Sequence, residues 1–182
     1  MIYTEALKNN IFSLISTCAE ELNLECYVIG GFVRDYIIKK SIPKDIDIVV
    51  VGDGIEFANY VSKKIKNTPK VTIFKTYGTA MFRYNDLEIE FVGARKESYN
   101  ENSRNPKVVT GTLEDDQNRR DFTINSMAFS LNKKHYGALV DPFNGLKDIE
   151  NKLIKTPLSP EVTYNDDPLR MLRAIRFATK LN

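Results

Sequence analysis

The segments Gly30-Gly31-Phe32-Val33-Arg34-Asp35 and Asp45-Ile46-Asp47 decide the fold class of this sequence. The first segment places two glycines between an apolar run and the start of a predicted helix. The second segment opens a stretch rich in β-branched residues, which favours a strand. Strand, glycine turn, helix and strand in this order are typical of an α/β domain.

Periodicity predicts further elements on both sides of these segments. Helical spacing of apolar residues predicts helices at 4–22, 32–40, 55–66 and 167–182. Strands are expected at 26–29, 45–51, 70–75, 79–84, 87–92 and 138–140. Thr112-Leu113-Glu114-Asp115 resembles a capping box that opens a short helix. Residues 94–111 are polar and lack periodicity, so we expect a mobile loop there.

Composition limits the classes of protein to which the chain can belong. Its 182 residues suit one domain, or one domain and a fragment of a second, and 42% hydrophobic residues allow a sizeable core. The net charge of +2 gives no general argument for nucleic acid binding. Cys18 and Cys26 lack metal-binding spacing and are predicted to be buried free thiols. No signal peptide or membrane span is recognisable, so we expect a soluble cytoplasmic protein.

Two carboxylates of the second segment point toward a metal site. Side chains alternate along a strand, so Asp45 and Asp47 lie on one face, with α-carbons roughly 6.6 Å apart. Such a pair suits Mg²⁺, which prefers oxygen ligands. A two-metal site needs a third carboxylate, for which Glu90 is the first candidate and Glu88 the second. An edge strand with an acidic exposed side remains the alternative at this point.

The glycine pair points toward a phosphate site. Without side chains, Gly30 and Gly31 let backbone N–H groups approach a polyphosphate, and the positive end of the following helix favours negative charge. Arg34 lies one turn further on and can bind two phosphate oxygens. A purely structural strand–helix junction is the alternative.

Together with three later motifs, these segments resemble the signature of class II tRNA nucleotidyltransferases and bacterial poly(A) polymerases, which belong to the polymerase β superfamily. The second motif is RRDFTIN at 119–125, the third is DPFNGLKDI at 141–149, and the fourth is DDPLRMLRAIRF at 166–177. The family usually has Glu-Asp where this chain has Asp166-Asp167. The motifs stand in the family's order and cover almost the whole chain.

The resemblance implies a polymerase β-like head with a mixed sheet flanked by helices at 1–150, followed by the start of a helical neck at 151–182. Family members continue into further helical regions, so we expect a part of a longer protein. Asp45, Asp47 and Glu90 would be catalytic, with Mg²⁺ held by the two aspartates. Nucleotide-binding roles carry over to Gly30, Gly31, Arg34, Arg120, Asn125, Asp167, Arg170, Arg173 and Arg176. The stretch 94–111 would correspond to the family's flexible loop.

Helical geometry allows the fourth motif to read a base. Three arginines fall within an arc of roughly 120° on one side of the predicted helix: Arg170, Arg173 and Arg176. The opposite side is the predicted core face: Met171, Ile175 and Ala178. An Asp167–Arg170 pair offers an acceptor and donors to the Watson–Crick edge of cytosine or adenine. Because Asp167 precedes Pro168, a capping role is the competing interpretation.

The predicted activity is Mg²⁺-dependent, template-independent addition of C and A from CTP and ATP to the 3′ end of tRNA, with release of pyrophosphate. Two alternatives within the fold are a poly(A) polymerase and an enzyme restricted to CC or A addition. A non-catalytic nucleotide- or RNA-binding module is the alternative from another class. His135, the one histidine, is predicted to be a surface turn residue, which favours metal-bound activation over a histidine base.

Overall fold

The computed structural model describes residues 1–100 and 103–181, without the side chains of 97–100 and 103–107. The α-helices are α1 (Asn10–Glu21), α2 (Gly31–Lys39), α3 (Gly54–Lys64), α4 (Leu113–Asn118), α5 (Gly145–Glu150), α6 (Pro160–Asp166) and α7 (Leu169–Leu181). The strands are β1 (Cys26–Ile29), β2 (Asp45–Val50), β3 (Thr72–Phe74), β4 (Thr79–Tyr84), β5 (Leu87–Gly93), β6 (Arg95–Asn100), β7 (Ser103–Thr110), β8 (Ala128–Ser130) and β9 (Leu139–Val140). Short 3₁₀ helices are η1 (Thr4–Leu7), η2 (Thr123–Asn125) and η3 (Lys133–His135).

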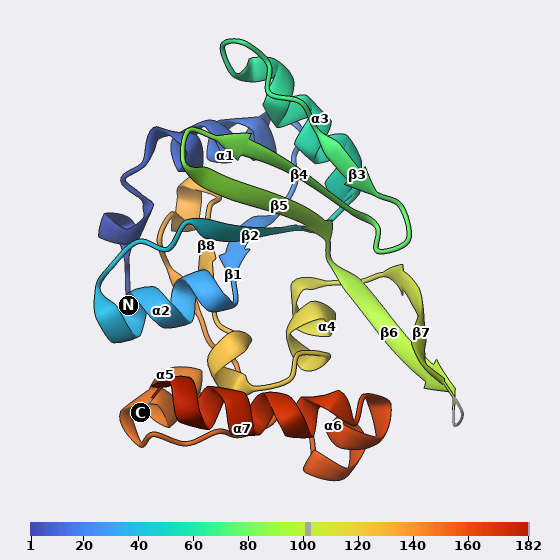
Figure 1. Ribbon diagram of the computed structural model, residues 1–182. Coiled ribbons are helices and arrows are strands. Elements are labelled where there is room, and N and C mark those ends of the chain that lie inside the picture. The colour runs from blue at the N-terminus through green and yellow to red at the C-terminus, as the bar shows by residue number, and fades with distance from the viewer. Residues whose placement is uncertain (101–102, 182) are drawn as a thin grey trace.

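A mixed sheet forms the centre of the molecule (Figure 1). Its seven strands follow the order β3-β4-β5-β2-β1-β8-β9. Strands β2 and β5 pair in parallel, and the other neighbours in this sheet pair antiparallel. The predicted fold class, a mixed α/β sheet flanked by helices, is therefore confirmed.

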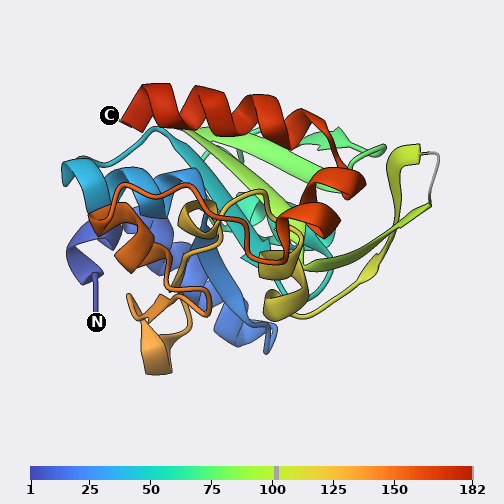
Figure 2. The same cartoon turned by 90° about the horizontal axis from the view of Figure 1, so that it is seen from below.

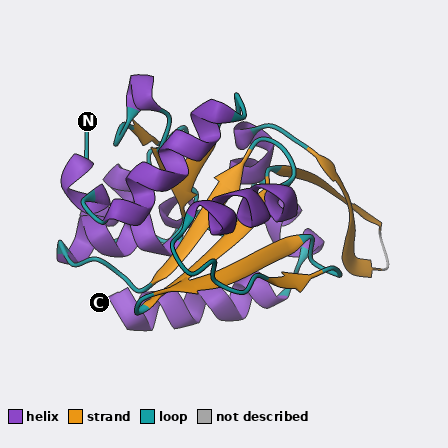
Figure 3. Ribbon diagram, turned by 90° about the horizontal axis from the view of Figure 1, so that it is seen from above, coloured by secondary structure: helices purple, strands orange, loops and turns teal. Residues whose placement is uncertain are grey.

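The two faces of β2 have opposite surroundings, as strand alternation requires. Ile46 and Ile48 are buried in the main core, where Phe32 of α2 and Phe57 of α3 also lie. Asp45 and Asp47 on the other face are exposed. Helices α1 and α3 lie above the sheet in Figure 1 and in front of the strands in Figure 3. The carboxylates therefore lie on the face that these helices leave open.

Helix α7 runs along the opposite side of the molecule from α1, beneath the sheet in Figure 1 and in front in Figure 2. The prediction that Met171, Ile175 and Ala178 form the core face of this helix is wrong. Met171 and Ile175 are 50% and 66% exposed, and Ala178 is exposed as well. The buried residues of α7 are Arg170 and Phe177. The arginine-bearing side faces the head because Arg170 and Arg173 form hydrogen bonds with the segment after α4. On the same side, Phe177 packs in a cluster with Phe122 and Ile124.

Three further expectations differ from the structure. The stretch 94–111 holds the antiparallel pair β6–β7 instead of a loop, and its residues 101–102 lie outside the described residues. The expected helix at 4–22 is divided into η1 and α1, since Asn9 caps α1 by accepting a hydrogen bond from the Ile11 amide. Helices α5 and α6 and strand β8 were not predicted, because each is short and lacks a clear apolar period.

Several local predictions are confirmed. Thr112 and Asp115 form the capping box of α4, each side chain bonding the other residue's amide. Cys18 and Cys26 are buried free thiols, and His135 is exposed in η3. Among the described residues, no helix is long and apolar enough to cross a membrane.

Candidate active site

A hollow of about 630 Å³ lies between the open face of the sheet, the segment after α4, and α7. All nine predicted nucleotide-binding residues line it, although they come from segments far apart in the sequence, and the predicted metal ligand Asp47 lines it as well. The nine are Gly30, Gly31, Arg34, Arg120, Asn125, Asp167, Arg170, Arg173 and Arg176. Asp45 and Glu90 are not among its lining residues. The tertiary structure thus brings three of the four motifs to one place.

The glycine turn at the base of the hollow has a conformation that requires glycine. Gly30 joins β1 to α2 with φ of +77°, in the region that L-residues rarely adopt. A Cβ atom at this position would lie 3.0 Å from Nη1 of Arg120 and 3.6 Å from Oδ2 of Asp47. The missing side chain therefore lets a carboxylate and a guanidinium approach the start of α2.

The predicted acidic residues lie on adjacent strands. In the parallel pair β2–β5, Asp47 is aligned with Glu90 and Asp45 with Glu88. Glu88 forms an ion pair with Arg83 on β4. Glu90 is therefore better placed than Glu88 to act together with Asp47. Within the described residues, no group of three or more acidic, histidine or cysteine side chains is arranged to hold a metal ion, so the role of Glu90 stays a prediction.

Electrostatics around Asp47 fit a cation. Asp47 is exposed at the hollow but surrounded by protein on its other sides, and this burial raises its pKa above the ordinary value. Arg120 opposes the rise, whereas the negative charges of Glu90, Asp45 and Asp116 add to it. A divalent cation would relieve this repulsion. Two carboxylates on one strand face, with water and phosphate oxygens completing the shell, suit Mg²⁺.

Arg34, the predicted phosphate ligand, is held firmly at the wall of the hollow. Only 4% of Arg34 is exposed. Its Nε donates to Oδ1 of Asp35 at 2.7 Å, and its Nη1 donates to Oδ1 of Asn125 at 2.5 Å. A guanidinium has five N–H groups, so these contacts orient Arg34 and still leave donors for an anion.

The arginines of the second motif share one buried carboxylate. Asp116 of α4 is fully buried; its Oδ1 accepts from Arg119 and its Oδ2 accepts from Arg120. Burial opposes ionisation of Asp116, but Arg120 and Arg119 outweigh it and hold its pKa below the ordinary value. Arg120 also donates from Nη1 to the Asn125 carbonyl at 3.3 Å. These bonds fix Arg120 beside the glycine turn.

Both predicted base-reading residues also have structural partners. Oδ1 of Asp167 accepts from the Leu169 amide at 3.2 Å, so the competing capping role is present. Arg170 is 8% exposed and donates to the Arg119 carbonyl at 2.7 Å and to the Thr163 carbonyl at 3.3 Å. Both side chains still line the hollow. Capping and base contact are therefore compatible for Asp167.

Residues 26–155 match the model of the poly A polymerase head domain. The chain belongs to this family. It is 43% identical to an A-adding tRNA nucleotidyltransferase of Aquifex aeolicus over 87% of its own length and 19% of that protein. It superimposes with a TM-score of 0.77 and 38% identity on a tRNA nucleotidyltransferase complexed with a primer tRNA and an incoming ATP analog, covering 90% of this chain and 44% of that one. For a tRNA-processing enzyme with CTP the TM-score is 0.78 at 38% identity, with 92% and 42% covered.

This member of the poly A polymerase head domain family therefore spans less than half of the length of these similar proteins. The family match ends within the segment between α5 and α6. Helices α6 and α7 follow the matched region, and Asp167 together with residues of α7 completes the wall of the hollow.

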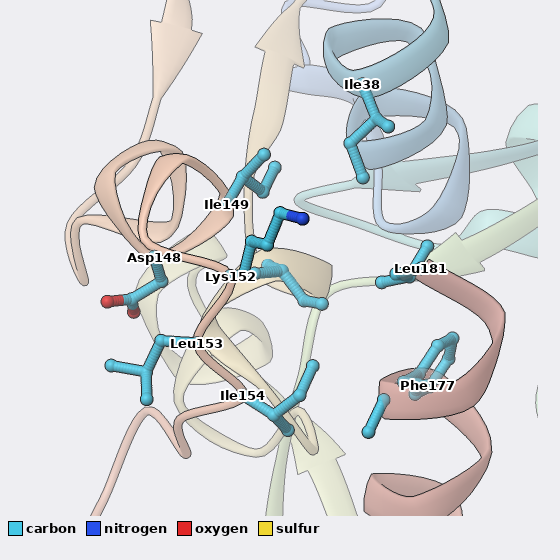
Figure 4. A pocket seen from close by; sticks show the side chains of 10 residues that line it. Ile38, Asp148, Ile149, Lys152, Leu153, Ile154, Phe177 and Leu181 are labelled. Atoms are coloured by element: carbon cyan, nitrogen blue, oxygen red, sulfur yellow. The ribbon is translucent and has the colours of Figure 1, made fainter.

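Sequence reasoning missed two side chains that organise the site of this poly A polymerase head domain. Asp116 precedes Arg119 and Arg120 by one helical turn, and this spacing is a recognisable signal for ion pairing. Phe177 gave no comparable signal, since an aromatic residue within a helix is ordinarily a core residue. It separates the polar hollow from an apolar cavity of about 230 Å³, lined also by Ile149, Ile154 and Leu181 (Figure 4).

Proposed function

We propose that this chain is the catalytic head of a nucleotidyltransferase that adds C and A to the 3′ end of tRNA from CTP and ATP. One observation carries the proposal: Asp47, the glycine turn and the arginines of the second and fourth motifs surround one hollow. Similar solved proteins hold a primer tRNA with an ATP analog in one case and CTP in another. In the proposed reaction the RNA 3′ hydroxyl attacks the α-phosphate, and pyrophosphate leaves.

The chain's own groups supply binding and orientation. Backbone N–H groups at Gly30 and Gly31, at the start of α2, would receive the triphosphate. Arg34 and Arg120, which both lie beside this turn, would contribute charge and donors, each already oriented by an acceptor atom of Asn125. Such preorganised donors stabilise negative charge without rearranging during reaction.

Asp45 and Asp47 would hold Mg²⁺, with Glu90 as the proposed third catalytic carboxylate. Bound there as a pair of ions, Mg²⁺ would activate the attacking hydroxyl and neutralise charge on the leaving group. The supporting observations are the shared face of β2, the alignment of Asp47 with Glu90, and the repulsion that raises the pKa of Asp47.

Base selection would belong to α7. The carboxylate of Asp167 accepts from the Leu169 amide, and it is proposed to accept also from the exocyclic amine of cytosine or adenine. Arg170 uses two of its donors on backbone carbonyls, and the others are proposed to reach a ring nitrogen or carbonyl. Arg173 and Arg176 line the same wall. We also propose a division into a head at 1–150 and the start of a neck at 151–182.

Restriction to A addition is the second candidate, because the similar Aquifex aeolicus protein is an A-adding enzyme. The chain should be incubated with Mg²⁺ and tRNA ending before CCA or after CC, with CTP, ATP or both, and the products sequenced. Growth by CCA supports the first proposal, A added only after CC supports the second, and a run of A indicates a poly(A) polymerase. Nucleotide binding without Mg²⁺-dependent turnover would indicate a non-catalytic module.

An aspartate exchange tests the catalytic assignment. Asp47→Ala should abolish extension of tRNA. Asp86→Asn is the control, because Asp86 is an exposed aspartate paired with Lys44 outside the hollow. Extension by the Asp47→Ala protein at the wild-type rate would refute the proposed function.

A further inference from the structure

The ring of Phe177 lies against two arginine side chains of the hollow. Cζ of Arg34 is 4.9 Å from the ring centroid, and Cζ of Arg173 is 5.4 Å from it. Arg34 belongs to α2, directly after the glycine turn, whereas Arg173 lies one turn before Phe177 on α7. One aromatic ring therefore connects the phosphate-binding turn with the fourth motif.

A chain of hydrogen bonds through Asn125 and Asp121 also links Arg34 with Arg173. Nη1 of Arg34 donates to Oδ1 of Asn125 at 2.5 Å. Nδ2 of Asn125 donates to Oδ1 of Asp121 at 2.9 Å, and Nε of Arg173 donates to Oδ2 of Asp121 at 2.7 Å. Phe177 supplies the remaining step between the two arginines. A shift of the ring would therefore change the position of both guanidinium groups.

The aromatic character of Phe177 matters beyond its volume. The negative face of a ring attracts a guanidinium, and the attraction grows when both groups are shielded from water. Arg34 and Phe177 are both buried. Phe177 also meets Phe122 edge-on, with 5.9 Å between the centroids, which holds the ring in place. A leucine would fill much of the same space but would offer no face to either arginine.

We propose that Phe177 is a positioning residue for nucleotide binding, which holds Arg34 and Arg173 in the arrangement that receives a nucleoside triphosphate. The ring makes the phosphate-binding turn and the base-reading helix parts of one rigid wall. This inference rests on the proposed function for the identity of the ligand, and the contacts of Phe177 are its own support.

Three variants separate positioning from packing: Phe177→Leu, Phe177→Tyr and Ile154→Ala. Ile154 packs against the same small cluster of Phe122, Ile124 and Phe177, so Ile154→Ala is a matched control for lost packing. Binding of ATP and of CTP is measured by calorimetry in Mg²⁺, together with the Tm of each protein. We expect Phe177→Leu to raise the Kd roughly three- to tenfold, as loss of two ring–guanidinium contacts implies. Phe177→Tyr should restore wild-type Kd, and Ile154→Ala should lower the Tm with an unchanged Kd.

A spectroscopic measurement tests the contact itself. In protein labelled with ¹⁵N-arginine, the Nε–Hε resonances of Arg34 and Arg173 should move in Phe177→Leu, because the ring current is lost, and should stay in place in Ile154→Ala. Wild-type affinity in Phe177→Leu, or an equal rise of Kd in Ile154→Ala, would overturn the inference and leave the proposed function intact. Absence of nucleotide binding by the unaltered chain would instead refute the proposed function.

Discussion

Arg173 donates a hydrogen bond from Nε to Oδ2 of Asp121 at 2.7 Å, and its Nη2 forms an ion pair with the same oxygen at 2.7 Å. Asp121 is buried and its partner guanidinium is about half exposed. The pair ties α7 to the segment before η2. Contact with this pair explains why the arginine-bearing side of α7 faces the head.

Replacing Asp121 with asparagine should destabilise the chain by about 1–2 kcal/mol, because the buried carboxylate of the pair loses its charge while water still reaches the half-exposed guanidinium of Arg173. In a protein that already carries Arg173→Gln, Asp121→Asn should lower the free energy of unfolding much less, because the ion pair is already broken. Urea unfolding of the two single variants and the double variant measures this coupling. Glu5→Gln, which breaks the exposed pair with Lys8, should leave the free energy of unfolding almost unchanged, because water screens this pair. Additive effects at Asp121 and Arg173 would contradict the prediction.

Stability should depend on pH through Asp116. Arg120 and Arg119 hold its pKa in the folded chain below the ordinary value despite burial, so the unfolded chain binds the proton more tightly. The resulting stabilisation is complete above the unfolded pKa of about 3.9 and is lost as pH falls through the folded pKa. Asp116→Asn should therefore lower the Tm at pH 7, and the difference from wild type should narrow below about pH 4. Thermal unfolding from pH 3 to 8 measures it, and a constant difference would contradict this assignment.

Substitution of Gly30 should combine backbone strain with displacement of Arg120. Gly30→Ala places a Cβ 3.0 Å from Nη1 of Arg120 at a φ of +77°, so we expect a loss of about 1–3 kcal/mol and loss of nucleotide binding. Gly78→Ala is the matched control, because Gly78 has φ of +64° and open space around it. It should show the strain alone, with unchanged nucleotide affinity. Equal nucleotide affinity in both variants would show that the close approach at Gly30 is unimportant.

Mg²⁺ should raise the Tm of the chain, because a ligand that binds only the folded state stabilises it. In Asp47→Asn this increase should disappear. Without Mg²⁺ this variant should be at least as stable as wild type, since one member of a repulsive carboxylate group is neutralised. Asp86→Asn should keep the full Mg²⁺-dependent increase. Thermal unfolding with a Mg²⁺ titration measures both effects, and a wild-type increase in Asp47→Asn would exclude Asp47 as a ligand.

Local patterns predicted much of the fold. Alternation in β2 placed Ile46 in the core and Asp47 on the open face, as observed. The glycine pair at Gly30 predicted the strand–helix junction, since few other residues adopt its positive φ. The capping box of Thr112 and Asp115 could be predicted because its two residues lie within one helical turn of each other. Each of these signals depends on neighbours in the chain.

Other features had no local signal. Strands β6 and β7 pair through their backbones, and polar side chains do not reveal such pairing. The sequence of α7 offered an apolar side, yet Ile175 is exposed and Arg170 is buried. Hydrophobicity alone therefore led to a wrong prediction of which side of α7 is buried. An arginine side chain can be buried without a large cost where carbonyl and carboxylate groups accept its hydrogen bonds.

The sequence by itself determined the identity of the motifs, the strand carrying Asp45 and Asp47, and the turn that needs glycine, because these depend on alternation and backbone conformation within a few residues. Tertiary structure alone decided that Asp116 holds Arg120 and that Phe177 meets Arg34. It also decided that the apolar side of α7, with Met171 and Ile175, stays exposed. These contacts join side chains whose electrostatic and aromatic attractions act only after the sheet and α7 have brought them together.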